Sequence, residues 1–102
     1  MDMNQIMKQA QEFQKKLGDM QNELAGRNIT STVGGGMVSA TVNGRHELIE
    51  LKIEKEVINP EDPEMLQDLV MSAVNEAMKQ AQEMIQSEMS KLTGGMNIPG
   101  LF

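Results

Sequence analysis

Residues 28–54 read NITSTVGGGMVSATVNGRHELIELKIE, and the order of side chains in this stretch predicts three β-strands. Apolar and polar residues alternate over 28–33, 37–42 and 49–54, as in strands with one buried face. The glycines at 34–36 allow the positive φ angles of a tight reversal, and Asn43-Gly44 is typical of a type I′ hairpin turn. The simplest arrangement is a three-stranded antiparallel meander. Its predicted apolar face holds Ile29 or its neighbours, Val38, Ala40, Val42, Ile49, Leu51 and Ile53.

A helix is predicted before these strands, over residues 2–25, with Gly26 as its stop. Its apolar residues recur at alternating steps of three and four, which is the heptad spacing of a seam that packs lengthwise on another helix. The seam consists of Met3, Ile6, Ala10, Phe13, Leu17, Met20 and Leu24. Lys8 and Lys15 fall on the face opposite to it.

A second, longer helix is predicted after the strands. Asp62 and Pro63 suit its N-cap and first position, and it continues to about Leu92. Such a helix is roughly 45 Å long, whereas a compact domain of this size is only about 34 Å across. Its apolar stripe would therefore project as an exposed patch of the kind that monomers avoid. We expect a homodimer with twofold symmetry.

The predicted fold class is thus α+β: a helix, a three-stranded antiparallel meander and a long helix, in a two-layer subunit that forms an intimate homodimer. Residues 1–92 are expected to form a single domain. Residues 93–102 are a Gly- and Pro-containing apolar tail, expected to be either flexible or docked.

Charge is unevenly distributed along the 102 residues, whose formal net charge is −6. Residues 57–102 hold two basic and seven acidic side chains, whereas residues 1–27 are balanced. The total argues against nucleic acid as a partner of the whole surface, but an anionic partner could approach the first helix. The absence of Cys, of a signal peptide and of a membrane-length apolar run predicts a cytoplasmic protein with no membrane partner.

No group of side chains suggests catalysis, so we expect no enzymatic activity, no cofactor, no metal and no small-molecule substrate. His46 is the only histidine and follows the second hairpin turn. The glycines at 34–36 precede no helix and lack the Lys-Ser/Thr pair of a phosphate loop. Four clustered acids lack calcium-loop spacing and are better explained by helix capping: Glu61, Asp62, Glu64 and Asp68.

The basic residues of the first helix are the candidate binding residues. Lys8 and Lys15 are nearly in line, and Lys16 lies on the flank. Lysine and the neighbouring glutamines can contact phosphates and base edges. By spacing alone, the same residues also fit an ordinary solvated helix face.

Several motifs spread over the chain resemble one small bacterial family. They are MKQAQ at 7–11, GGMV at 35–38, TVNG at 41–44, EMLQDLV at 64–70, AVNEA at 73–77 and GGMNIPG at 94–100. Together they resemble the YbaB/EbfC family of nucleoid-associated proteins. The resemblance implies a homodimer of α-β-β-β-α subunits that binds DNA in the bacterial nucleoid, with a role in chromosome organisation or gene regulation. It also implies that the long helices grip DNA, through Lys8, Lys15, Lys16 and Lys91.

A prefoldin-like or coiled-coil module that binds partner polypeptides is the alternative. Such a protein also has a helix, a hairpin and a helix, and methionine-rich surfaces suit adaptable interfaces. It would carry two matched long helices, whereas the first helix predicted here is clearly shorter than the second.

Overall fold

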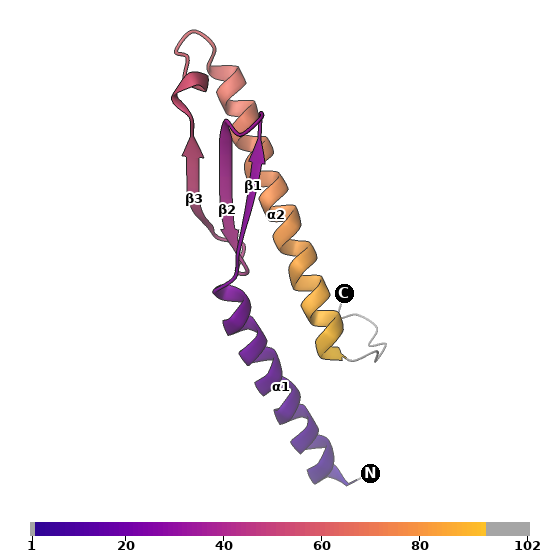
Figure 1. The fold of residues 1–102 in the computed structure, drawn as a ribbon. Helices are drawn as coiled ribbons and strands as arrows, with labels where there is room; N and C mark the ends of the chain where they lie inside the picture. The colour runs from indigo at the N-terminus through magenta and orange to yellow at the C-terminus, as the bar shows by residue number, and fades with distance from the viewer. Residues whose placement is uncertain (1, 94–102) are drawn as a thin grey trace.

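The computed structural model describes residues 2–93, which fold in the predicted order of helix, meander and helix (Figure 1). The elements are α1 (Met3–Ala25), β1 (Asn28–Val33), β2 (Val38–Asn43), β3 (Leu48–Ile53), η1 (Lys55–Val57) and α2 (Pro63–Thr93). The short 3-10 helix η1 was not predicted. Thr93, expected to begin the tail, is the last residue of α2, and the remainder of the predicted tail lies outside the described residues.

The three strands form one antiparallel sheet in the order β1-β2-β3, which confirms the predicted meander. Val38 of β2 is paired with Val33 on one side and Ile53 on the other. Hydroxyl pairs link β1 to β2 on the polar face, with Oγ1 of Thr30 2.7 Å from Oγ1 of Thr41. This face is exposed, as the alternation in the sequence predicts.

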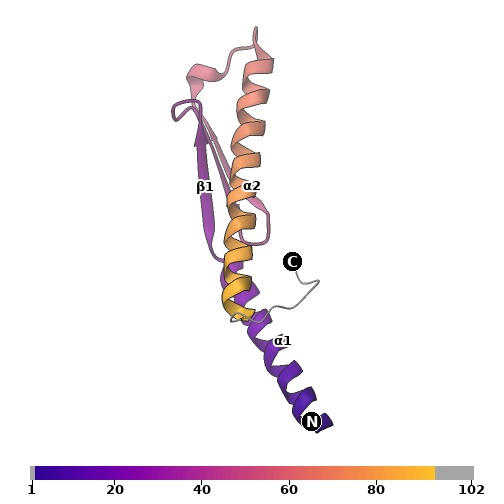
Figure 2. The same ribbon diagram turned by 90° about the vertical axis from the view of Figure 1, so that its right-hand side faces the viewer.

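Three alanines of α2 make the closest packing on the sheet. Ala73, Ala77 and Ala81 are fully buried, as are Val38, Ala40 and Val42 of the central strand. A spacing of four residues places the alanines on one face of α2, and their small side chains let the helix approach the sheet. The helix covers β2 and β1 (Figure 2). The resulting core is small, since its largest fully buried side chains are Val38 and Val42.

Strand β3 is left largely uncovered, which corrects the expectation that its apolar residues lie on a buried face. Leu51 remains 40% exposed and Ile49 50% exposed. Ile49 is displaced by a bulge, because the register shifts between Thr41 and Val42 so that Val42 pairs with Leu48. Since α2 lies mainly over the other two strands, Leu48, Ile49 and Leu51 stay exposed in the described part of the chain, and only Ile53 of β3 packs against the core.

The two strand connections use glycine for different reasons. Gly34, Gly35 and Gly36 all have positive φ angles, as predicted for the first reversal. The prediction of a type I′ turn at Asn43-Gly44 is wrong, because neither residue has a positive φ. The Asn43 side chain instead accepts hydrogen bonds from the backbone N–H groups of Arg45 (2.9 Å) and Glu47 (3.1 Å).

Gly44 is required by its contact with the end of α1. Its N–H donates a hydrogen bond to the carbonyl oxygen of Leu24 at 3.0 Å. A Cβ atom at residue 44 would lie 2.1 Å from that oxygen, so no other residue fits without movement of the backbone. Leu24 is the only buried residue of α1, and this contact attaches the helix to the sheet.

The molecule is elongated, with principal extents of 69 × 23 × 17 Å and a radius of gyration of 19.3 Å. A compact domain of this length would have a radius of gyration near 13 Å. Both helices extend past the sheet, and α1 continues beyond the end of α2 (Figures 1 and 2). The start of the heptad seam is therefore open, with Met3 71% and Ile6 45% exposed. In the part of the chain that the structure describes, neither helix is apolar enough over a sufficient length to cross a membrane.

Replacement of Gly44 by alanine is expected to loosen α1 from the sheet. The new methyl group would collide with the Leu24 carbonyl, so we expect Gly44→Ala to lower the free energy of unfolding in urea by about 1–3 kcal/mol. Gly18 is a matched control, because a Cβ there meets nothing within 4 Å. Gly18→Ala should stabilise α1 by about 0.5–1 kcal/mol, and an equal loss in both variants would contradict this role of Gly44.

Candidate nucleic-acid interface

Helix α1 presents its lysines on an arm that stands clear of the sheet. The Asp2 side chain caps the helix by accepting the Asn4 backbone N–H at 3.2 Å. Lys8 and Lys15 are exposed and stand two turns apart, which corresponds to about 10.5 Å along the helix axis. They therefore form one row on the side of the helix away from the apolar seam.

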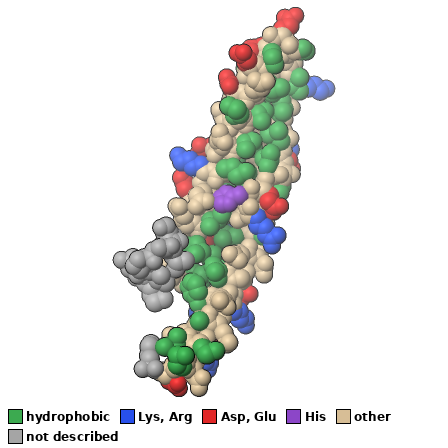
Figure 3. Space-filling view, turned by 180° about the vertical axis from the view of Figure 1, so that it is seen from behind, with side chains coloured by type: hydrophobic (Ala, Val, Ile, Leu, Met, Phe, Trp, Pro, Cys, Tyr) green, Lys and Arg blue, Asp and Glu red, His purple; other side chains and the backbone are tan. Residues whose placement is uncertain are grey.

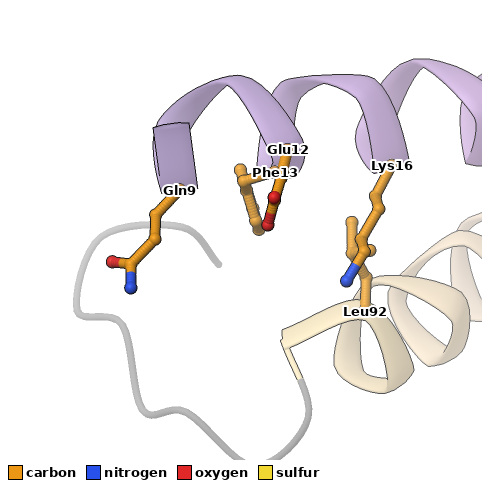
Figure 4. A pocket seen from close by; sticks show the side chains of 5 residues that line it. All are labelled: Gln9, Glu12, Phe13, Lys16 and Leu92. Atoms are coloured by element: carbon orange, nitrogen blue, oxygen red, sulfur yellow. The ribbon is translucent and has the colours of Figure 1, made fainter. Parts of the chain in front are cut away.

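Lys16 lies on the flank of α1 that approaches the end of α2. Together with Gln9, Glu12, Phe13 and Leu92 it lines an open hollow of about 300 Å³. Its side chain extends from α1 toward Leu92 of α2 (Figure 4). The structure thus places Lys8 and Lys15 on one row and sets Lys16 apart, beside the hollow that both helices line.

The four predicted binding lysines differ in their ion pairs. Among the described residues, no carboxylate lies within 4.0 Å of the Nζ atom of Lys8, Lys15 or Lys16. Lys91 of α2, in contrast, lies 3.3 Å from Oε1 of Glu88. A phosphate would have to compete with Glu88 for Lys91, but not with a paired carboxylate of residues 2–93 for the three lysines of α1.

Arg27 joins α1 to α2 through ion pairs. It lies just after the Gly26 C-cap of α1, and its Nη2 atom bonds Glu23 of α1. Its Nη1 atom lies 3.1 Å from Oε1 of Glu88, the same oxygen that Lys91 approaches. Sequence reasoning missed this residue as a site residue. The spacing of Glu23 and Arg27 was a signal for their pair, but none pointed to Glu88, 61 residues away.

These contacts lower the pKa of Glu88. The hydrogen bond from Lys91 has the largest effect and the bond from Arg27 the next, and both favour the ionised carboxylate. The same network raises the pKa of Arg27, chiefly through Glu23 and then through Glu88. Both residues are therefore charged at neutral pH.

Residues considered for other chemistry take ordinary places in the fold. The side chain of Asp62 accepts the Met65 backbone N–H at 3.3 Å, as expected of a helix cap. His46 is exposed in the turn before β3, where its φ of 61° is positive. Within residues 2–93, no three His, Cys, Asp or Glu side chains are grouped so that they could hold a metal ion.

Both the sequence and the fold resemble those of known proteins. Residues 1–96 match a family model described as the YbaB/EbfC DNA-binding family. A nucleoid-associated protein of Clostridium acetobutylicum is 59% identical over 100 residues, which cover 98% of this chain and 89% of that protein. A nucleoid-associated protein of a Thermoanaerobacter species is 52% identical over 101 residues, covering 99% of this chain and 91% of that one. The crystal structure of an uncharacterized protein from Helicobacter pylori superposes with a TM-score of 0.82 at 30% identity, over 90% of this chain and 97% of that one.

Protonation of Glu88 should remove the link between the helices. Because its pKa is lowered in the folded state, Glu88 stabilises the fold above its unfolded pKa, and this contribution is lost as the pH falls through the folded pKa. We expect Glu88→Gln to lower the free energy of unfolding at pH 7, and the difference from wild type to shrink below about pH 4. Denaturant titrations at several pH values measure this.

Glu83 is the matched control for that measurement. It lies on the same helix and forms no ion pair among the described residues. Glu83→Gln should change the free energy of unfolding by no more than about 0.5 kcal/mol at neutral pH. A Glu88→Gln effect that stayed constant down to pH 3 would show that the carboxylate charge is not involved.

Proposed function

The chain belongs to the YbaB/EbfC DNA-binding family, and from this we propose that it binds duplex DNA as a homodimer through the lysines of α1. It is a DNA-binding, nucleoid-associated protein, as the family and the names of its relatives support. We further propose that the protein acts as a homodimer, that it catalyses no reaction, and that it has a role in chromosome organisation or gene regulation. The observation that carries the proposal is the row of lysines on a projecting helix, which form no ion pair with any carboxylate of residues 2–93.

The lysines of α1 are suited to phosphate contacts. Lys8 and Lys15 are exposed on an arm of 23 residues, about 34 Å long, which is close to one turn of B-DNA. Neither has to leave a paired carboxylate of residues 2–93 to reach a phosphate. Lys16 and Lys91 extend this set toward the end of α2. To contact a phosphate, Lys91 would first have to break its ion pair with Glu88. Since the whole chain carries −6, binding depends on this local row.

A second copy is proposed to cover the uncovered face of β3. Three apolar side chains of β3 are 40–50% exposed there, Leu48, Ile49 and Leu51, and Met71 of α2 is 58% exposed. Hydrophobic side chains gather in a band on this side of the molecule (Figure 3). The edge of β3 also has no strand partner in residues 2–93. An isologous contact between two copies would bury this face and enlarge a core that now consists of little more than valine and alanine.

The prefoldin-like alternative is not favoured. Helix α1 has 23 residues and α2 has 31, so the two helices are not the matched pair that such a module requires. The family match over residues 1–96 also indicates DNA binding.

DNA binding through α1 should depend steeply on salt. We expect the double variant Lys8→Gln, Lys15→Gln to weaken binding to a fluorescent duplex, measured by anisotropy over a salt series. Each phosphate contact adds about 0.9 to the slope of log K against log salt, so the slope should become clearly shallower. Lys55, on η1 at the far end of the sheet, is the control, and Lys55→Gln should retain most of the slope. Equal losses in both variants would contradict a specific role for α1.

The dimer contact can be tested by placing charge on β3. Two charged residues facing each other across a twofold contact repel and lose hydration, so Ile49→Glu and Leu51→Glu should shift sedimentation from dimer toward monomer. Thr32→Glu, on the exposed polar face of the sheet, should leave the dimer intact. A dimer that survives both β3 variants would place the interface elsewhere.

A further inference from the structure

The one buried residue of helix α1 is Leu24, at the end where the helix meets the sheet. The carbonyl oxygen of Leu24 accepts the N–H groups of Gly44 and Arg27, each at 3.0 Å. Every other described residue of α1 is exposed or half-buried. The direction in which α1 projects therefore depends on the contacts next to Leu24 and on the contacts between α1 and α2.

Arg27 provides the polar contact between the two helices at this end of α1. Its guanidinium bridges Glu23 on α1 and Glu88 on α2 with two different nitrogen atoms. The Glu88 side chain is only 18% exposed, compared with 41% for Arg27, so it is the shielded partner. A planar guanidinium with several fixed donors suits two carboxylates at once, which a single ammonium group does not.

We propose that Arg27 is a positioning residue for DNA binding: through Glu88 it holds α1 at a fixed angle to α2, and so it places Lys8 and Lys15. This inference rests on the proposed function of the α1 lysines. A hinge at residues 24–27 is far from the tip of α1, so a small change of angle there moves Lys8 by several ångströms. In a homodimer the α1 helices of both subunits would be displaced in this way.

Glu88 distinguishes positioning from simple charge. If charge alone mattered, removing an acidic side chain from this anionic protein would strengthen DNA binding, and removing Arg27 would weaken it. If Arg27 acts by positioning, Glu88→Gln and Arg27→Gln both weaken binding, although they change the net charge in opposite directions. The double variant keeps the net charge of the wild type, yet it should bind as weakly as either single variant.

Anisotropy titrations of a fluorescent duplex at one low salt concentration test this directly. We expect Arg27→Gln, Glu88→Gln and the double variant each to weaken binding about twofold to fivefold, the range of an exposed ion pair. Arg27→Lys keeps the net charge of the wild type but not the two-sided guanidinium contact, so it should also bind DNA more weakly than wild type. Glu83→Gln, the charge control on α2, should leave binding unchanged or slightly tighter. Far-ultraviolet circular dichroism and sedimentation confirm that each variant keeps its helices and assembly.

A distance measurement tests the arm angle without DNA. The chain contains no Cys, so spin labels can be attached at Gln11→Cys on α1 and Gln82→Cys on α2, both exposed. Labelled subunits are diluted with unlabelled ones so that only distances within one chain are read. The distance distribution should broaden in Arg27→Gln and Glu88→Gln, but not in Glu83→Gln.

The outcomes separate this inference from the proposed function. Tighter DNA binding by Glu88→Gln, or an unchanged distance distribution in Arg27→Gln, overturns the positioning role. If the Lys8 and Lys15 double variant binds like wild type, the proposed DNA face is wrong, whereas the distance measurement still decides whether Arg27 holds α1. The positioning role is supported if Arg27→Gln and Glu88→Gln each broaden the distance distribution and each weaken DNA binding.

Discussion

The contact of the α2 alanines with the central strand is the constraint on which the other features depend. Ala73, Ala77 and Ala81 are fully buried because they face Val38, Ala40 and Val42 at short range. A helix that lies this close to β2 also covers β1 and leaves most of β3 uncovered. The same position carries the end of α2 past the sheet to meet α1. Both the open apolar strand and the projecting arm therefore follow from one packing contact.

A small core and a large open face belong together in this protein. The buried side chains of the sheet and α2 are mainly valine and alanine, which release little free energy on burial compared with larger side chains. The larger apolar residues Leu48, Ile49 and Leu51 lie instead on the uncovered strand. Covering them with a second copy would add the missing apolar burial, and this links folding to assembly.

The acidic composition is compatible with DNA binding because much of the negative charge lies outside α1. Residues 57–102 hold seven of the fifteen acidic side chains, whereas α1 is neutral, with three lysines and the acids Glu12, Asp19 and Glu23. Screening at physiological salt limits electrostatic interactions to about 8 Å, so distant acids have little effect on phosphates held at the arm. Lys91 is different, because Glu88 occupies it, and its contribution depends on how easily phosphate replaces that carboxylate.

Local patterns in the sequence determined the elements and the row of lysines. The cap at Asp62, the stop at Gly26 and the period of two in the strands all act within a few residues, so the helices, the strands and their order could be predicted. The face shared by Lys8 and Lys15 follows from helical period alone. The family resemblance added the function, which neither spacing nor charge established.

Only the tertiary structure decided what depends on residues distant in sequence. The bulge that displaces Ile49 arises from pairing with β2, and Gly44 is needed because Leu24 of another element lies against it. The exposure of β3 depends on where α2 lands, and the pairing of Arg27 with Glu88 joins residues 61 positions apart. Periodicity describes which side of an element is apolar, whereas the position of its neighbours decides whether that side is covered.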